Sequence, residues 1–160
     1  MQSPSRSRAG ETGSANAGDV ETLIELCEHM HDETAYAFLP FDRAKVRRVI
    51  EAYLANPASH CVLVVRSENT PVGMLLGYIS EYDFCDATIA CDSVFYVLPQ
   101  FRSWRAAAGL IRAFRDWAAE RGAREVCMGI SSNVEVARIT KLYERLGLTC
   151  IGGTFKQRLS

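Results

Sequence analysis

The most constraining feature of this sequence is a strand-like run that ends at a proline and leads through a basic turn into a long amphipathic helix and a second strand. The first run is Ala87–Leu98, and Pro99 ends it because proline cannot donate to a strand ladder. The helix that follows closes at Gly122 and has apolar residues at helical spacing: Ala107, Leu110, Ile111, Phe114, Trp117 and Ala118. Glu125–Ile130 is the second strand. Because it follows a crossover helix, it is expected to lie parallel to the first.

Two helices and an antiparallel meander are predicted around this unit on its N-terminal side. Asp19 and Asp42 are suited to cap amphipathic helices that end near His31 and at Asn56-Pro57. Three strand-like runs joined by short turns then predict the meander. These runs are His60–Arg66, Val72–Tyr82 and Ala87–Leu98.

The C-terminal part predicts a fourth helix and one or two further strands. The helix closes at Gly147, and the strand candidates are Thr149–Ile151 and Thr154–Leu159. Residues 1–17 are polar and predict a flexible tail, which leaves residues 18–160 as a single domain. The predicted fold class is α/β, with a mixed, mostly antiparallel central sheet and helices on both faces.

Composition argues against several kinds of protein. The 160 residues include 18 basic and 19 acidic ones, and a net charge of −1 argues against a general nucleic-acid binder. There is no secretory signal and no apolar run of the roughly 20 residues that a membrane span needs, so a cytoplasmic protein without membrane contact is expected. The six cysteines form no CxxC pair and lack a histidine at zinc spacing, which predicts buried reduced thiols and no metal.

The turn before the third helix has the features of an anion site. Arg102 and Arg105 add charge to a helix start whose first amides lack helical partners and carry partial positive charge. The small side chains of Ala106, Ala107 and Ala108 would let a ligand approach the backbone closely. This combination suits a pyrophosphate, and an ordinary basic helix start explains it equally well.

Two motifs resemble the GNAT N-acetyltransferase superfamily. The segment Arg102-Ser-Trp-Arg-Ala-Ala107 is similar to the family's coenzyme A loop, Arg/Gln-x-x-Gly-x-Gly/Ala, with Arg105 in place of the middle glycine. The segment Leu142-Tyr-Glu-Arg-Leu-Gly-Leu148 is similar to the family signature at the end of its fourth helix. Phe95–Val97 and Ser131-Ser132 look most like acetyltransferases of phages and their bacterial hosts. The family's opening strand has no counterpart in the polar tail.

The resemblance implies a site for acetyl-CoA. In the family, the strand before the loop splays from its parallel neighbour and the pantetheine arm pairs with it, while the loop holds the pyrophosphate. Here the strand residues would be Tyr96, Val97 and Leu98, and the loop residues would be Arg102, Ser103, Trp104, Arg105, Ala106 and Ala107. Asn133 resembles an asparagine of the fourth helix, although it comes three residues early, and its alternative is a helix N-cap.

The resemblance also implies direct acetyl transfer to an amine, with an acid and a base. Tyr143 stands where the family has a tyrosine that protonates the departing thiolate, and the alternative is a tyrosine that only packs. Glu81 and Asp92 are equally ranked candidates for the base. By alternation Asp92 shares a face with Val94 and Tyr96, where burial would raise its pKa. For Glu81, the alternative to a base is a solvated carboxylate at the end of its strand.

The sequence thus predicts an enzyme that transfers an acetyl group from acetyl-CoA to a primary amine of a small molecule or a protein. The acidic segment Glu81–Asp86 favours a cationic acceptor, and a solvated turn explains it as well. The resemblance allows a homodimer, since family members are often dimers, whereas the residues themselves do not indicate an oligomeric state. One alternative is a non-catalytic binding module of the same fold, since the loop departs from the glycine pattern. The other is an unrelated phosphate-binding α/β domain.

Overall fold

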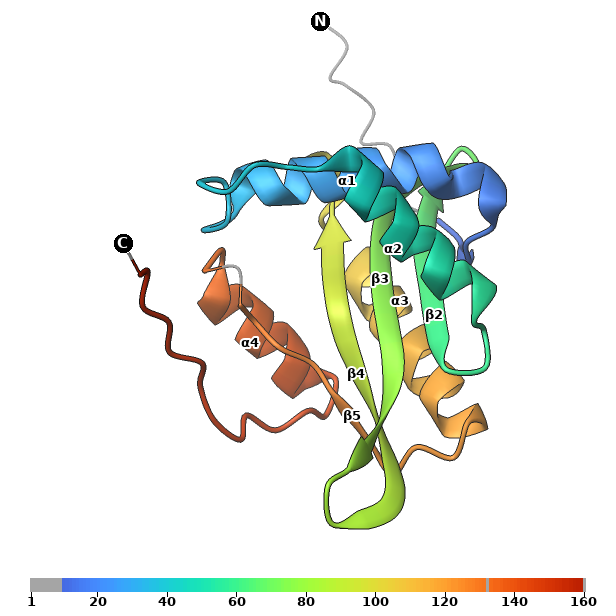
Figure 1. Cartoon of the computed structure of the whole chain (residues 1–160), viewed down its shortest axis with the longest axis vertical. Coiled ribbons are helices and arrows are strands. Elements are labelled where there is room, and N and C mark those ends of the chain that lie inside the picture. The colour runs from blue at the N-terminus through green and yellow to red at the C-terminus, as the bar shows by residue number, and fades with distance from the viewer. Residues whose placement is uncertain (1–9, 132, 160) are drawn as a thin grey trace, which may run out of the picture.

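The computed structural model describes residues 10–131 and 133–159, and within them a five-stranded sheet separates two layers of helices (Figure 1). The strands follow chain order across the sheet: β1 (Thr12–Ser14), β2 (His60–Ser67), β3 (Thr70–Tyr82), β4 (Cys85–Val97) and β5 (Glu125–Cys127). Neighbours are antiparallel except for β4 and β5, which are parallel. The predicted mixed sheet and its parallel pair are therefore confirmed.

The described part of the chain contains four α-helices, as predicted. They are α1 (Val20–Glu33), α2 (Arg43–Ala55), α3 (Trp104–Glu120) and α4 (Val136–Arg145). In Figure 1, α1 and α2 lie over one face of the sheet and α3 lies behind it. The fourth helix packs on α3 and on Phe95 of β4. Short 3₁₀ turns at Ala17–Asp19 and Pro99–Phe101 precede α1 and α3.

The two faces of the sheet follow the alternation of β2. Val62 and Val64 pack under α1 and α2, whereas Leu63 and Val65 pack under α3. On the α3 face, Gly77 of β3 allows an especially close approach. A Cβ atom built there would lie 2.4 Å from a ring carbon of Phe114, which is fully buried.

The strand β1 corrects the expectation of a polar tail without an opening strand. Its three residues pair antiparallel with Val65, Val64 and Leu63 of β2. Backbone pairing does not require apolar side chains, so a polar segment can complete a sheet edge that β2 would otherwise leave open. Residues 1–9 of the predicted tail and Ser132 lie outside the described part of the chain.

The predicted caps of the first two helices have different outcomes. The Asp42 side chain accepts from the Lys45 amide at 3.0 Å, so it caps α2 as predicted. Asp19 does not cap α1 with its side chain. It accepts instead from the Asn16 amide at 2.8 Å and from both terminal nitrogens of Arg66, each at 2.8 Å. A cationic partner on β2, 47 residues away, thus outcompetes the local cap.

The C-terminal segment corrects two other expectations. Residues 148–159 contain no helix or strand, although Thr149–Ile151 and Thr154–Leu159 were predicted as strands. Ile151 and Phe155 are 93% and 97% exposed. A strand needs a neighbour to satisfy its backbone, and β-forming residues alone do not supply one. The segment is held instead through Lys156, which donates to the Ser131 carbonyl at 3.2 Å.

The cysteines lie in the described residues and none is in a disulfide. Cys27 and Cys61 are buried, as predicted. The remaining thiols depart from the prediction: Cys91 is half-buried, while Cys85, Cys127 and Cys150 are exposed. Cys85 lies at the hairpin end of β4 and Cys127 on the edge strand β5, where apolar neighbours in the sequence do not ensure burial.

Candidate active site

The site begins where β4 and β5 separate. They pair only through Ile89, Ala90 and Cys91 on β4. Beyond Cys91, β4 continues to Val97, whereas β5 ends at Cys127. The register of β4 against β3 also shifts here, because Gly77 faces Asp92 and Leu76 faces Val94, which leaves Ser93 as a bulge. Within the described residues, the edge of β4 from Asp92 to Val97 has no strand paired to it on the β5 side.

This bulge changes the face on which Asp92 lies. Strict alternation predicted Asp92 on the face of Val94 and Tyr96, and those two residues do pack under α1. The Asp92 carboxylate instead accepts from the Gly129 amide at 2.9 Å and is close enough to Tyr143 of α4 to influence it. The extra residue at Ser93 breaks the period of two, so the prediction of the face is wrong.

The Asp92 carboxyl has the electrostatic character of a base near neutral pH. Burial raises its pKa from 3.8 to about 6, and the Gly129 hydrogen bond opposes part of the rise. Since the carboxylate form prevails above pH 6, the group can accept a proton in the neutral range.

Tyr143 lies beside this carboxyl. It is buried in a cluster with Ile111 of α3, and its ring lies 6.3 Å from that of Phe95. Its hydroxyl donates to the Gly129 carbonyl at 3.3 Å. Burial, followed by the charge of Asp92, raises the pKa of Tyr143, which keeps the phenol protonated. Gly129 thus links the predicted acid and one predicted base through its carbonyl and its amide.

The start of α3 presents backbone donors to the same region. The Ser103 hydroxyl accepts from the Ala106 amide at 3.2 Å, and the Ser103 carbonyl accepts from the Ala107 amide at 3.2 Å. These contacts occupy two of the amides expected to hold a pyrophosphate. The amides of Trp104 and Arg105 open the helix, where no carbonyl of the helix itself can pair with them.

A cleft of about 600 Å³ lies between these elements and the C-terminal end of α1. The predicted residues that line it are Tyr96, Val97, Arg102, Ser103, Trp104 and Ala107. The cleft is also lined by charged residues that the sequence did not single out: Glu33, Glu135, Arg138, Lys141 and Arg145. Together with Arg102, these charges leave an excess of cations, which suits a polyanionic ligand.

The other predicted site residues are not among the lining. Tyr143 packs on the lining residue Phe95, and Asp92 is close to Tyr143. The Leu98 amide donates to the Val72 carbonyl at 2.9 Å. Arg105 is exposed, and Ala106 is buried under the helix. Asn133 is exposed with a left-handed φ of 62°, three residues before α4, so it is not the cap of that helix.

Glu81 is also remote from the lining. It is exposed near the hairpin end of β3, where it pairs with Thr88. The structure therefore brings Asp92, and not Glu81, together with Tyr143.

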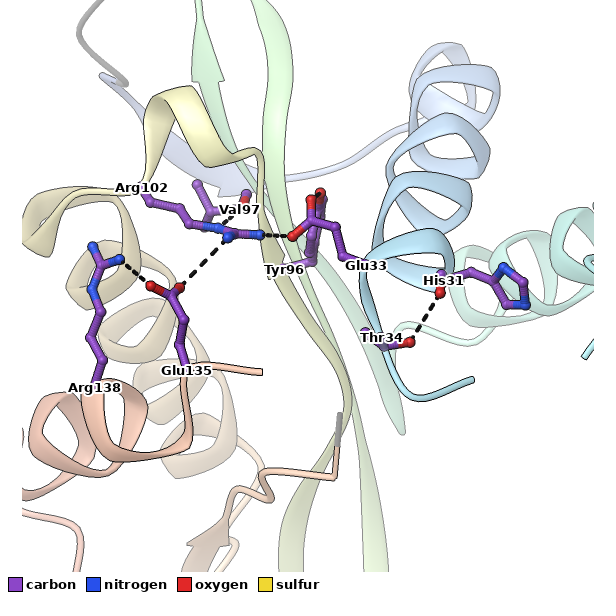
Figure 2. A network of polar contacts seen from close by, with 8 residues as sticks. All are labelled: His31, Glu33, Thr34, Tyr96, Val97, Arg102, Glu135 and Arg138. Carbon is purple, nitrogen blue, oxygen red and sulfur yellow. Dashed lines mark hydrogen bonds and ion pairs between the residues drawn. The ribbon is translucent and has the colours of Figure 1, made fainter. Parts of the chain in front are cut away.

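Arg102 is the centre of an ion-pair network across the mouth of the cleft (Figure 2). Its Nε donates to the Val97 carbonyl at 2.8 Å. One terminal nitrogen contacts the Glu33 carboxylate, and the other lies 3.6 Å from Glu135. Glu135 in turn accepts from Arg138 at 2.8 Å. The guanidinium thus connects the end of β4 with the end of α1 and the start of α4.

Glu33 is firmly held in this network. It accepts from the Tyr96 hydroxyl as well as from Arg102. Burial by itself would raise the pKa of Glu33, but the hydrogen bonds from Tyr96 and Arg102 outweigh it and lower the pKa. Glu33 and Arg102 are 69 residues apart in the chain. No local motif joins residues at such a separation, and sequence reasoning therefore missed Glu33.

Two further properties concern only residues 10–131 and 133–159. Nowhere in them do three or more His, Cys, Asp or Glu side chains gather so that they could hold a metal ion. None of the helices there has the length and apolar character needed to cross a membrane.

Comparison with known proteins identifies the family. The model of the acetyltransferase (GNAT) family matches residues 23–148, and the chain therefore belongs to this family. The sequence matches none of the curated proteins. The family resemblance carried by the segments at Arg102–Ala107 and Leu142–Leu148 is thereby confirmed.

Solved structures share the fold at low sequence identity. The aminoglycoside N-acetyltransferase AAC(6')-Iy, in complex with the bisubstrate analogue CoA-S-monomethyl-acetylneamine, is 18% identical, with a TM-score of 0.73 over 94% of this chain and 97% of that chain. An acetyltransferase of Trypanosoma brucei is 16% identical, with a TM-score of 0.70 over 93% and 99% of the two chains. The ribosomal-protein-alanine N-acetyltransferase of Brucella melitensis biovar Abortus is 17% identical, with a TM-score of 0.72 over 93% and 98%.

Proposed function

We propose that this protein transfers the acetyl group of acetyl-CoA to a primary amine. The observation that carries the proposal is the cleft at the open edge of β4, which combines excess positive charge with backbone donors at the start of α3. The acid–base pair of Asp92 and Tyr143 lies next to its lining residue Phe95, on which the Tyr143 ring packs. Family membership makes acetyl transfer the expected chemistry.

The phosphates of acetyl-CoA are proposed to bind at the start of α3. The amides of Trp104 and Arg105 have no partner within the helix, Trp104 lines the cleft, and a helix N-terminus favours anions. Arg138 and Lys141 of α4 line the opposite wall and supply further charge. Arg102 holds the Val97 carbonyl, so a pantetheine arm that pairs there would displace it.

The two proton transfers are assigned to Asp92 and Tyr143. Acetyl-CoA supplies an activated acyl group whose C–S bond breaks as the amine nitrogen attacks the carbonyl carbon. An amine must lose its proton to become a nucleophile, and the Asp92 carboxylate, whose pKa is about 6, can accept that proton. The Tyr143 hydroxyl, kept protonated by burial and by Asp92, can donate to the thiolate that leaves.

The acceptor is proposed to be a cationic amine. The segment Glu81–Asp86 contains several exposed carboxylates at the hairpin end of β3 and β4, and these would attract cations. Among the fold relatives, one is named for aminoglycosides and another for ribosomal-protein alanine. The acceptor panel should therefore contain both small polyamines and peptides with a free amino terminus. A cytoplasmic location and a homodimer stay predictions.

The direct test is release of the CoA thiol from acetyl-CoA across this amine panel. The wild-type protein is expected to release thiol with at least one amine, and Tyr143→Phe is expected to lower kcat while binding acetyl-CoA as before. A full rate in that variant would remove Tyr143 from the acid role. No release with any amine would favour the non-catalytic module.

A thermal melt separates the remaining alternatives. Acetyl-CoA at about 100 times its dissociation constant should add roughly 2.7 kcal/mol of stability. An unmoved midpoint would contradict binding altogether. Equal stabilisation by ADP at the same concentration would favour a general phosphate-binding domain.

A further inference from the structure

Strands β4 and β5 each carry a cysteine at the last position where they pair. Cys91 and Cys127 are register partners in a parallel pair, so their side chains project from the same face of the sheet. Neighbouring strands lie about 4.8 Å apart, which is within the range of roughly 4.4–6.8 Å that disulfides span between Cα atoms. The two thiols also interact. Burial raises the pKa of Cys91 most, and the charge of Cys127 raises it further.

The two thiols differ in access to solvent. Cys127 is exposed at the outer edge of the sheet, and Cys91 is half-buried one strand further in. On the side away from β5, Cys91 is the register partner of Tyr78 of β3. A hydrogen bond with Tyr78 lowers the pKa of the Cys91 thiol, which opposes the effect of burial. A solute therefore reaches Cys127 first, and Cys91 lies directly behind it.

The other four cysteines lack this arrangement. Cys27 and Cys61 are buried, and burial raises the pKa of their thiols to about 11 and about 12. Cys85 is exposed but faces Tyr82 across the hairpin. Cys150 is exposed in the segment without regular structure.

We propose that Cys91 and Cys127 form a vicinal dithiol that peroxides oxidise to an intramolecular disulfide and that small thiols reduce again. The Cys127 thiolate attacks the O–O bond of the peroxide, so that hydroxide leaves and a sulfenic acid remains. The Cys91 sulfur then attacks the Cys127 sulfur, the S–O bond breaks, and the oxygen leaves as water with the Cys91 proton. Two thiols and one hydrogen peroxide thus yield one disulfide and two waters.

Closing this bond would draw the end of β5 toward β4. The Cβ atoms of a disulfide lie about 3.8 Å apart on average, so the Cys127 side chain and the strand end that carries it must adjust to reach Cys91. Cys127 is the last residue of the edge strand β5, so we expect its end to follow the bond inward. Gly129, two residues further on, contacts both Asp92 and Tyr143. The Tyr143 ring packs on Phe95, which lines the cleft, so oxidation is expected to alter that wall of the cleft. This consequence rests on the proposed function, whereas the disulfide itself does not.

The primary test is a thiol count on the full chain after treatment with hydrogen peroxide. Free thiols in the denatured protein should fall from six to four, and dithiothreitol should restore six. Peptide mapping without reductant should find Cys91 joined to Cys127. The matched control Cys85→Ser, which removes an exposed thiol from the same strand, should still form this bond. A stable count of six, sulfinic acid at Cys127 with Cys91 unchanged, or a bond to any other cysteine would overturn the proposal.

Phenylarsine oxide gives an independent measurement, because its trivalent arsenic bridges two neighbouring thiols. The reduced protein should bind one arsenical per chain, and both Cys91→Ser and Cys127→Ser should abolish this binding, while Cys85→Ser should retain it. Binding that survives in either serine variant of the pair would contradict the dithiol.

The link to the cleft is tested by thermal melts with acetyl-CoA. Oxidised wild-type protein should lose the stabilisation that the reduced protein shows. An unchanged shift would overturn the link. If the reduced protein shows no shift at all, the proposed function fails, and the thiol count still decides on the disulfide.

Discussion

Replacing Asp92 with asparagine should make the protein more stable at neutral pH. The pKa of Asp92 rises from 3.8 to about 6 because the carboxylate is buried. At about 1.4 kcal/mol per pKa unit, ionising this group in the folded protein costs about 3 kcal/mol more than in the unfolded chain. An asparagine oxygen can still accept from the Gly129 amide, which the carboxylate now does at 2.9 Å. Asp92→Asn should therefore remove the cost and keep the contact.

The effect has a defined pH dependence. Between pH 3.8 and pH 6 the folded protein holds a proton on Asp92 that the unfolded chain has lost, so wild-type stability falls as the pH rises through this window. Above pH 6 the wild type has lost all of this stability, and below pH 3.8 it has lost none of it. The variant should therefore exceed the wild type by up to about 3 kcal/mol at pH 7 and by little at pH 3.5.

Urea unfolding of the two proteins at a series of pH values measures this difference. Asp86→Asn is the matched control, because Asp86 lies on the same strand but is exposed, and its effect should stay within about 0.5 kcal/mol. A stability difference for Asp92→Asn that does not change with pH would refute the reasoning. So would a variant less stable than the wild type at pH 7. The same variant should release thiol more slowly, since it lacks the proposed base.

Further predictions concern packing, a buried ion pair and the mouth of the cleft. Gly77→Ala should lower the free energy of unfolding by about 1–3 kcal/mol in urea titrations, because the new methyl meets a buried ring at 2.4 Å, and an unchanged value would contradict that packing. Arg66→Met should cost about 1–3 kcal/mol at pH 7, because it leaves Asp19 buried without its cation. Arg66 lowers the pKa of Asp19 below 3.8, so this contribution is complete above that pH and is lost as the pH falls further; a cost that persists undiminished at pH 2 would refute it. Glu33→Gln should tighten acetyl-CoA binding in calorimetry, because Arg102 then loses a carboxylate that competes with the ligand, and weaker binding would argue that the ion pair positions Arg102 for the ligand.

Local patterns predicted most of the secondary structure. The amphipathic spacing of α2 and its cap at Asp42 are properties of a few neighbouring residues, and both are confirmed. The strand–helix–strand unit around α3 also follows from local signals, because a crossover helix leaves a parallel arrangement of β4 and β5. The family motifs lie in this same unit and in α4.

Strand formation was predicted less well at both ends of the chain. The polar residues Thr12–Ser14 form β1 because β2 offers them an edge, and their side chains give no sign of it. The β-branched and aromatic residues of 148–159 form no strand, since no neighbour pairs with them. A strand is a property of a pair of segments, whereas propensity belongs to one.

The sequence by itself determined the order of helices and strands from α1 to α4, the parallel pair and the family motifs, because helical and strand periods depend on residues close in the chain. Only the tertiary structure decided which side chains meet at the cleft. One bulge at Ser93 turned Asp92 toward Tyr143, and folding brought Glu33 to Arg102 across 69 residues. Such contacts depend on the register and packing of distant segments, which no local period encodes.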